Sequence, residues 1–168
     1  VELPELGKEL GITASHVFIS RDKKPIGVFL LKDRLKEGVK KTIHEIQALG
    51  LKTYLLSGDN EETTKWVSKE LNLNHYLAKV SPFEKAKFIK ELQEKGSKVI
   101  MVGDGINDGP ALGQADTSIS MGTGTDLAIS ASDITIVKGD IDKVFLFLQL
   151  SKKTMSIIRQ NLFLSFIY

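Results

Sequence analysis

The residues most able to do chemistry lie between positions 99 and 112, where the sequence reads Val-Ile-Met-Val-Gly-Asp-Gly-Ile-Asn-Asp-Gly-Pro-Ala-Leu. A short β-branched run ends in a glycine turn that carries two carboxylates, Asp104 and Asp108, with Asn107 beside them. Pro110 suits a first helical turn, so we predict a strand, a loop and a helix in that order. Oxygen ligands at the carboxyl end of a buried strand, beside a helix N-terminus, suit Mg²⁺ and phosphate. The alternative is an ordinary Asx-rich turn, but such a turn needs one Asp or Asn and this loop has three.

Two other glycine-containing patterns exclude common nucleotide-binding motifs. Gly103-Asp104-Gly105 and Gly122-Thr123-Gly124 both begin like a dinucleotide fingerprint, yet neither has the third glycine at the required place. The chain also has no G-x-x-x-x-G-K-[ST] sequence. Any nucleotide chemistry is therefore neither that of a Rossmann dehydrogenase nor that of a P-loop NTPase.

Composition and charge fit one ordinary α/β domain. The 168 residues are 42% hydrophobic and 26% charged, with a formal net charge of +2 and no cysteine. The lysines are scattered and mostly alternate with glutamate, so no nucleic-acid partner is predicted. Without cysteine the chain can form neither a disulfide framework nor a thiolate metal site. The first residues, Val-Glu-Leu-Pro-Glu-Leu, lack the features of a signal peptide and an initiator Met, so we expect a piece of a longer chain.

The apolar periodicity predicts strands and helices in alternation with short loops. This pattern indicates a parallel, doubly wound sheet covered on both faces. Because two of the loops leave the same carboxyl edge of such a sheet, we expect Ser57, Asp59, Asp104 and Asp108 to converge there. Strands are predicted at 17–20, 26–30, 53–56, 75–80, 99–102, 118–120 and 134–137, and helices at 36–49, 61–71, 82–94, 126–131 and from 140 to the end.

The C-terminal helix has a different character from the others. Its last seven residues are apolar apart from Ser165, and Lys152, Lys153 and Arg159 precede them. Basic residues of this kind flank membrane segments on the cytoplasmic side. Seven residues fall far short of the ~20 that a span requires, and a core helix with an aromatic stripe is the alternative. A core helix should keep a polar face, so we predict that 151–168 begins a transmembrane helix in contact with lipid.

Five short motifs occur in order along most of the chain. Besides residues 103–112, they are Asp33-Arg34-Leu35-Lys36, Ser57-Gly58-Asp59-Asn60, Ser81-Pro82-Phe83-Glu84-Lys85 and Met121-Gly122-Thr123-Gly124-Thr125-Asp126. These resemble the hinge motif and the "DPLR", "TGDN", "xPxxK" and "MGxGTD" motifs of the P-type ATPases, with Ser in place of Thr in "TGDN". P-type ATPases are ATP-driven cation pumps of the haloacid-dehalogenase superfamily. The resemblance implies a haloacid-dehalogenase-like α/β fold, with Mg²⁺ and ATP as cofactors.

The resemblance also implies the roles of the site residues. Asp104 would ligate Mg²⁺ directly, and Asp108 would complete the acidic site directly or through water. Lys85 would place its ammonium on the phosphoryl oxygens, and Ser57 would donate its hydroxyl to the same group. Asn107 would form hydrogen bonds within the loop or to the phosphorylated site.

Three further residues have smaller implied roles. Gly58 and Asp59 would contact the nucleotide or close the interdomain gap. Asp33 would organise the hinge, although a carboxylate at a helix N-terminus is a nearly equal alternative.

One expected motif is missing. P-type ATPases form an aspartyl phosphate on an Asp-Lys-Thr-Gly-Thr sequence, which does not occur in these 168 residues. We therefore expect residues 1–25 to be the tail of a nucleotide-binding domain and 26–150 the C-terminal part of a phosphorylation domain. The chain alone should bind Mg²⁺ weakly and catalyse nothing, and its sheet should lack a central strand.

The C-terminal helix also bears on the transported ion. Asn161 and Tyr168 match the "N-x6-Y-N" pattern of copper(I)-transporting P-type ATPases, whereas zinc, cadmium and lead pumps usually have a lysine further along. Copper(II) and silver relatives commonly have glycine where this chain has Ile167. We therefore predict a membrane-bound copper(I) pump, with this part on its cytoplasmic side. The alternatives are a pump for another metal cation, a soluble phosphatase of the same superfamily, or a non-catalytic regulatory module.

Overall fold

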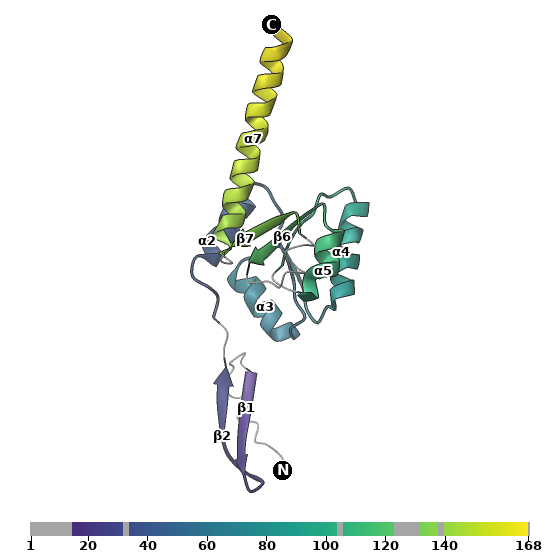
Figure 1. Ribbon diagram of the computed structural model, residues 1–168. Helices are drawn as coiled ribbons and strands as arrows, with labels where there is room; N and C mark the ends of the chain where they lie inside the picture. The colour runs from purple at the N-terminus through teal and green to yellow at the C-terminus, as the bar shows by residue number, and fades with distance from the viewer. Residues whose placement is uncertain (1–14, 32–33, 104–105, 123–131, 138–139, 168) are drawn as a thin grey trace.

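The computed structural model describes residues 15–31, 34–103, 106–122, 132–137 and 140–167 (Figure 1). Strands and helices alternate along most of this length, as predicted. The predicted helix at 126–131 lies outside the described residues. The elements are β1 (Ser15–Arg21), β2 (Lys24–Leu31), α2 (Val39–Ala48), β3 (Tyr54–Leu56), α3 (Glu61–Glu70), β4 (His75–Leu77), α4 (Pro82–Glu94), β5 (Ile100–Gly103), the 3₁₀ turn η1 (Ile106–Asp108), α5 (Gly109–Gln114), β6 (Thr117–Gly122), β7 (Ile134–Val137) and α7 (Asp142–Ile167).

The strands of the α/β body are parallel, as the alternation predicted, and they form two sheets. One sheet pairs β3 with β4, and the other has the order β5-β6-β7. No backbone ladder joins the two sheets among the described residues. Register in the larger sheet pairs Ile100 with Thr117 and Ile119 with Ile134, so β5 and β6 begin at the same edge.

Helices cover both faces of the larger sheet. On one side, Ile46 of α2 and Val144 of α7 pack with Ile119 and Ile136 of the strands in a single buried cluster. On the other side lie α4 and α5, which pack against each other (Figure 1). Helix α5 buries Ala111 and Leu112, and α4 buries Ile89. The expectation of a sheet covered on both faces is therefore confirmed for this sheet.

Glycine follows the last turn of two of the helices. Gly50 follows α2 with φ +83°, and Gly96 follows α4 with φ +84°. Both donate their N–H to a carbonyl three residues back, Gly50 to Gln47 at 2.9 Å and Gly96 to Gln93 at 2.8 Å. A left-handed residue just after a helix favours glycine because other side chains are strained there.

Strand β4 is shorter than predicted. The apolar pattern indicated 75–80, whereas the strand ends at Leu77. Lys79 adopts φ +55°, and its N–H donates to the Asp59 carbonyl at 2.8 Å. The chain therefore turns toward the loop after β3 instead of continuing the ladder.

Two elements extend from the α/β body in opposite directions (Figure 1). The antiparallel hairpin β1–β2 leaves large apolar side chains exposed on its described strands, among them Ile26 and Phe29. The predicted domain boundary after residue 25 falls within β2, so the hairpin continues across it. The three-part division of the chain remains a prediction.

Helix α7 packs against α2 near its start and is exposed from Lys152 to Ile167. Among the described residues, no helix combines the length and the apolar character needed to cross a membrane. The predicted entry of 151–168 into a membrane therefore remains a prediction.

Candidate functional site

The loop after β5 places Asp108 where the sequence predicted it. Asp108 ends η1 and directly precedes α5, which has Pro110 in its first turn. The side chain is buried, although the loop lies at the carboxyl end of a strand. Asp104, its predicted partner, lies outside the described residues. One of the two predicted carboxylates is thus located at the carboxyl edge of the larger sheet.

A lysine from another element neutralises this carboxylate. Lys85 Nζ of α4 donates to Asp108 Oδ1 at 2.8 Å, and the two side chains are only 13% and 12% exposed. Two predicted site residues, 23 positions apart, are therefore brought into direct contact. The motif resemblance implied that Lys85 contacts phosphoryl oxygens and that Asp108 completes the Mg²⁺ site, and the pairing of the two residues was not predicted.

Gly103, the last residue of β5, makes room for the Asp108 side chain. A Cβ atom at position 103 would lie 2.7 Å from Asp108 Oδ2 and 2.8 Å from Asp108 Cβ. Such distances are shorter than van der Waals contact, so the carboxylate could not keep its place. The first glycine of the motif is thus required by close packing.

The start of α4 fixes the position of Lys85. Ser81 and Glu84 form a reciprocal capping box: Glu84 N–H donates to Ser81 Oγ at 3.3 Å, and Ser81 N–H donates to Glu84 Oε2 at 2.7 Å. These hydrogen bonds with Ser81 lower the pKa of Glu84. Pro82 occupies the first turn, where its missing N–H costs nothing. Ser81–Lys85 is therefore a helix-initiating sequence that also places its lysine in the first turn.

Ser57 and Asp59 form a second local pair in the loop after β3. The Ser57 hydroxyl donates to Asp59 Oδ2 at 2.7 Å, and the Asp59 N–H donates to Ser57 Oγ at 3.1 Å. Backbone hydrogen bonds join this loop to the residues leading into α4, since Val80 N–H donates to the Ser57 carbonyl at 3.1 Å. In the described part of the chain, no hydrogen bond connects the Ser57–Asp59 pair with Lys85 or Asp108. The predicted convergence is thus supported only by these backbone links.

The other predicted residues either adjoin these pairs in the chain, lie far from them or are not described. Asn107 is exposed in η1, next to Asp108, and Gly58 lies between Ser57 and Asp59. Asn161 is exposed on α7, and Asp33 and Tyr168 lie outside the described residues.

The donor atoms present fit a hard cation. Asp108 supplies a carboxylate and Asn107 an amide oxygen, the ligand types that Mg²⁺ prefers. No cluster of three or more His, Cys, Asp or Glu side chains suited to a metal ion occurs among the described residues, which do not include Asp104. The described part of the loop could therefore contribute to a Mg²⁺ site without completing it.

A polar network at the opposite end of β5 was not predicted. Asp116 accepts hydrogen bonds from Lys98 Nζ at 2.7 Å, Gln93 Nε2 at 2.9 Å and Val99 N–H at 3.0 Å. These donors, Lys98 above all, hold the pKa of Asp116 well below its usual range. Gln93 also donates to the Gln114 carbonyl at 3.0 Å, so the network ties the end of α4 to the end of α5.

A buried group of hydroxyl side chains on β6 was also missed. Asp133 accepts from Ser118 N–H at 2.8 Å and from Ser118 Oγ at 2.9 Å, while Ser132 Oγ donates to Ser120 Oγ at 2.8 Å. The backbone hydrogen bond from Ser118 is the main cause of the lowered pKa of Asp133. The serines stand two positions apart on one strand, and that spacing could have indicated a shared polar face.

The chain is similar to known proteins in sequence and in fold. The family model described as "Hydrolase: haloacid dehalogenase-like hydrolase" matches residues 3–116. The chain is 43% identical over 152 residues to the probable copper-transporting ATPase PacS of Synechocystis sp., which covers 90% of this chain and 20% of the relative. It is 44% identical over 146 residues to the copper-exporting P-type ATPase B of Archaeoglobus fulgidus, covering 87% and 21%. The chain thus spans about a fifth of the length of these curated relatives.

Solved structures give the same fold. A zinc-transporting PIB-type ATPase in its E2.Pi state matches with a TM-score of 0.83 and 33% identity, covering 93% of this chain and 26% of that one. The catalytic domain of the CPx-ATPase CopB-B matches with a TM-score of 0.62 and 36% identity, covering 75% and 50%. The described α/β body is therefore similar to the corresponding part of heavy-metal P-type ATPases.

Proposed function

Because this chain belongs to the haloacid dehalogenase-like hydrolase family, we propose that it supplies the Mg²⁺-binding and phosphoryl-stabilising half of the phosphorylation domain in an ATP-driven copper(I)-transporting P-type ATPase. Its homology to copper-transporting P-type ATPases supports the parent activity. The observation that carries the site assignment is the contact between Lys85 and Asp108, which brings two motif residues together at the carboxyl end of β5.

In this proposal the chain acts by positioning charge. Phosphoryl transfer needs little covalent chemistry from the protein beyond orientation and neutralisation of negative charge. A bound Mg²⁺ would supply the charge that neutralises phosphoryl oxygens. Asp104 and Asp108 would hold the ion, with Asn107 beside them. Lys85, held in the first turn of α4, would lie close enough to share its ammonium between Asp108 and a phosphoryl group.

The loop after β3 would contribute the remaining contacts. Ser57 would turn its hydroxyl from Asp59 toward the phosphoryl group, because its proton is now donated to Asp59. Gly58 and Asp59 would face the nucleotide. The backbone links between this loop and the start of α4 support the placement of both on one side of the site.

The nucleophile would come from elsewhere in the parent protein. No Asp-Lys-Thr-Gly-Thr sequence occurs in the 168 residues. In this proposal the residues named above bind and neutralise, and the aspartyl phosphate forms on a residue outside these 168 positions. The isolated chain should therefore have no ATPase activity of its own.

The names of the relatives favour copper as the transported metal. The two curated relatives described above are named for copper, while the solved structure with the TM-score of 0.83 transports zinc. We assign Asn161 and Tyr168 to the ion pathway of a membrane-bound parent, with 26–150 on the cytoplasmic side. A pump for another metal cation is the second candidate, and the similarity to the zinc transporter favours it.

The test is acid-stable phosphorylation of the polypeptide encoded by the complete reading frame. With radiolabelled ATP and Mg²⁺, copper(I) should stimulate incorporation into the parent protein and into an Asp140→Ala control. Asp140 is an exposed aspartate whose contact is with Lys143. Asp104→Ala should abolish incorporation because the Mg²⁺ ligand is removed.

The other possible results of the phosphorylation test would contradict the Mg²⁺ assignment or favour an alternative function. Undiminished phosphorylation of Asp104→Ala would contradict the Mg²⁺ assignment. Stimulation by zinc(II) in place of copper(I) would favour the other-cation pump. No phosphoenzyme with any ion would favour a phosphatase or a regulatory module.

A further inference from the structure

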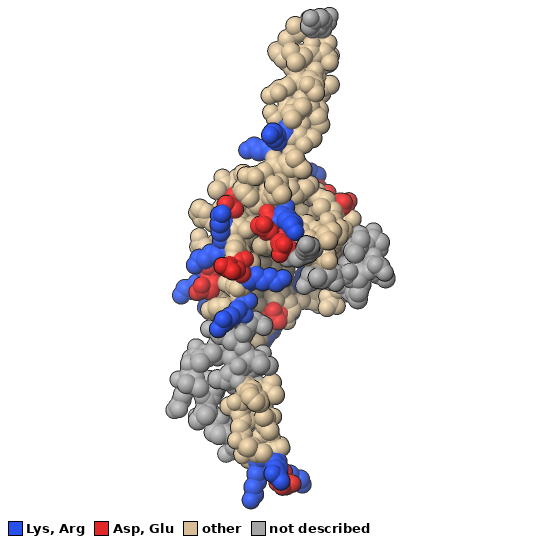
Figure 2. All heavy atoms as spheres, turned by 60° about the vertical axis from the view of Figure 1, so that its left-hand side comes forward, with Lys and Arg blue, Asp and Glu red and all other residues tan. Residues whose placement is uncertain are grey.

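The projecting part of α7 carries positive charge without any acidic residue. Lys152, Lys153 and Arg159 are its ionisable side chains, and no Asp or Glu follows Asp142. They account for three of the 23 Lys and Arg residues and for none of the 21 Asp and Glu residues, so the rest of the chain has a net charge of −1. No ion pair involves these three side chains among the described residues. On the face in Figure 2, this part of the helix shows blue but no red spheres.

Hydrogen-bond donors and cations share one side of this helix. Lys152, Ser156, Arg159 and Gln160 follow the spacing i, i+4, i+7 and i+8, which places them along a single face. The apolar side chains of Met155 and Phe163 lie beside them on the same exposed surface of the helix. This surface therefore offers charge and hydrogen bonds beside apolar side chains, and we call these six residues the basic stripe.

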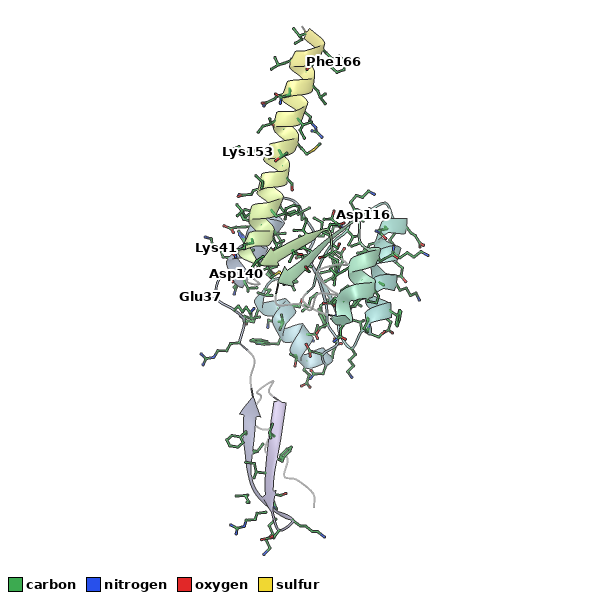
Figure 3. The ribbon with its side chains drawn as sticks, viewed as in Figure 1. Glu37, Lys41, Asp116, Asp140, Lys153 and Phe166 are labelled. Carbon is green, nitrogen blue, oxygen red and sulfur yellow. The ribbon has the colours of Figure 1, made fainter. Side chains whose placement is uncertain are left out.

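Exposed apolar side chains lie directly beyond the basic stripe. Leu162, Leu164 and Ile167 are 55%, 58% and 64% exposed, and Phe166 is 88% exposed. Figure 3 shows Lys153 and Phe166 pointing away from the helix axis at two heights along α7. A band of cations followed by an apolar tip is the order that an interface between lipid headgroups and acyl chains requires.

We propose that the basic stripe binds the phosphate of anionic phospholipid headgroups. Lys152 and Arg159 would pair with the phosphate, and Ser156 and Gln160 would donate hydrogen bonds to it. Met155 and Phe163 would contact the glycerol and the first acyl carbons, while Lys153 adds attraction from a neighbouring face. The inference rests on the proposed membrane location of the end of α7, and it adds selectivity for negative lipid. A nucleic acid or an acidic protein would use the charge and leave the apolar tip in water.

The experiment compares binding of the full 168-residue chain to two kinds of vesicle. One contains phosphatidylcholine alone, and the other contains phosphatidylcholine with phosphatidylglycerol. Each Lys or Arg near an anionic surface strengthens binding about fivefold. Lys152→Gln/Arg159→Gln should therefore bind the anionic vesicles about 25-fold more weakly than the parent chain. Added salt should weaken the parent chain more than the variant, because salt screens the lost attraction.

A matched control removes the same charge elsewhere. Lys65→Gln/Lys90→Gln changes two exposed lysines on α3 and α4 and should bind like the parent chain. Glutamine keeps helix propensity close to that of lysine and arginine, so folding should be unaffected in both variants.

The remaining outcomes separate the headgroup site from the proposed membrane placement of α7. Equal binding of Lys152→Gln/Arg159→Gln and the parent chain to anionic vesicles would overturn the headgroup site. Equal binding of the parent chain to both vesicle types would also overturn it, while leaving apolar contact with lipid in place. Binding to neither vesicle would overturn the membrane placement of α7 as well. A tighter complex with a polyanion such as RNA than with anionic vesicles would assign the basic stripe to another partner. The phosphorylation test of the parent protein is read independently of all these results.

Discussion

Two lysine–aspartate pairs lie at opposite ends of β5. Their Nζ–Oδ1 distances are similar, but the exposure of their side chains is very different. The Nζ–Oδ1 distance is 2.8 Å for Lys85 and Asp108 and 2.7 Å for Lys98 and Asp116. The first pair has side chains that are 13% and 12% exposed, whereas Lys98 is 88% exposed and Asp116 24%. A short distance therefore does not distinguish the proposed site pair from a structural one.

The other contacts of each carboxylate make the distinction. Asp116 accepts from a glutamine and a backbone N–H besides its lysine, so its oxygen atoms are well supplied with donors. Among the described residues, Asp108 accepts only from Lys85, and its Oδ2 packs closely against Gly103. In this part of the chain Asp108 thus has one donor where Asp116 has three, which fits a carboxylate that binds a further group better than one that holds elements together.

The largest difference is expected when each lysine is removed. Lys85→Met should lower the free energy of unfolding by about 3 kcal/mol, because it leaves a buried carboxylate without its cation. Lys98→Met, the matched control, should cost less than about 1 kcal/mol, since its ammonium is largely in water. Urea denaturation followed by circular dichroism measures both. Equal losses would show that burial does not separate the two pairs.

A smaller loss is expected from filling the space at the end of β5. Gly103→Ala should destabilise the chain by about 2 kcal/mol, because the new methyl group would displace Asp108. Gly113→Ala in α5 is the control, since a Cβ there meets no atom within 4 Å. The control should gain about 0.5–1 kcal/mol from reduced backbone freedom. Unchanged stability of Gly103→Ala in the same denaturation experiment would contradict the tight seating of Asp108.

The smallest effect concerns acid stability at the other end of the strand. The pKa of Asp116 is lower in the folded chain than its reference value of 3.8, so its contribution to stability is complete above that value and is lost as pH falls below it. Asp116→Asn should therefore show a flatter decline of its unfolding temperature between about pH 5 and pH 2 than the parent chain. Glu84 and Asp133 have lowered pKa values too, so some decline should persist. If the unfolding temperatures of Asp116→Asn and the parent chain fell equally steeply with pH, the Asp116 hydrogen bonds would not be formed in solution.

The elements were predictable where their signals are local. Apolar periodicity located the helices, and Gly50 and Gly96 marked two helix ends because the left-handed conformation favours glycine. Strand β4 was overextended because nothing in the sequence around Lys79 indicates a left-handed residue. The motif resemblance predicted Asp108 and Lys85 as site residues, and the structure places them in contact.

Contacts between elements were harder to predict from the sequence. The pairing of Lys85 with Asp108 depends on how α4 docks against α5, and the need for Gly103 depends on where Asp108 then lies. The contact between Lys98 and Asp116 could have been foreseen, since Lys98 lies two residues before β5 and Asp116 directly precedes the neighbouring parallel strand β6. Asp104 lies outside the described residues, so its predicted role is open to the phosphorylation test alone.

Helix α4 makes the two parallel sheets dependent on each other. Phe88 packs against Tyr54 of β3 with ring centroids 5.8 Å apart, while Lys85 and Gln93 bind the α5 side. With no backbone ladder between the sheets in the described chain, side chains of two helices contact both sides. Besides α4, helix α2 packs Ile46 into the core of the larger sheet and donates from Gln47 Nε2 to Thr53 Oγ1, just before β3, at 2.8 Å. Amide hydrogens in β3–β4 and in β5–β7 should therefore exchange as one cooperative unit while both helices stay docked. Loosening α4 alone would weaken this coupling and leave α2 as the remaining link.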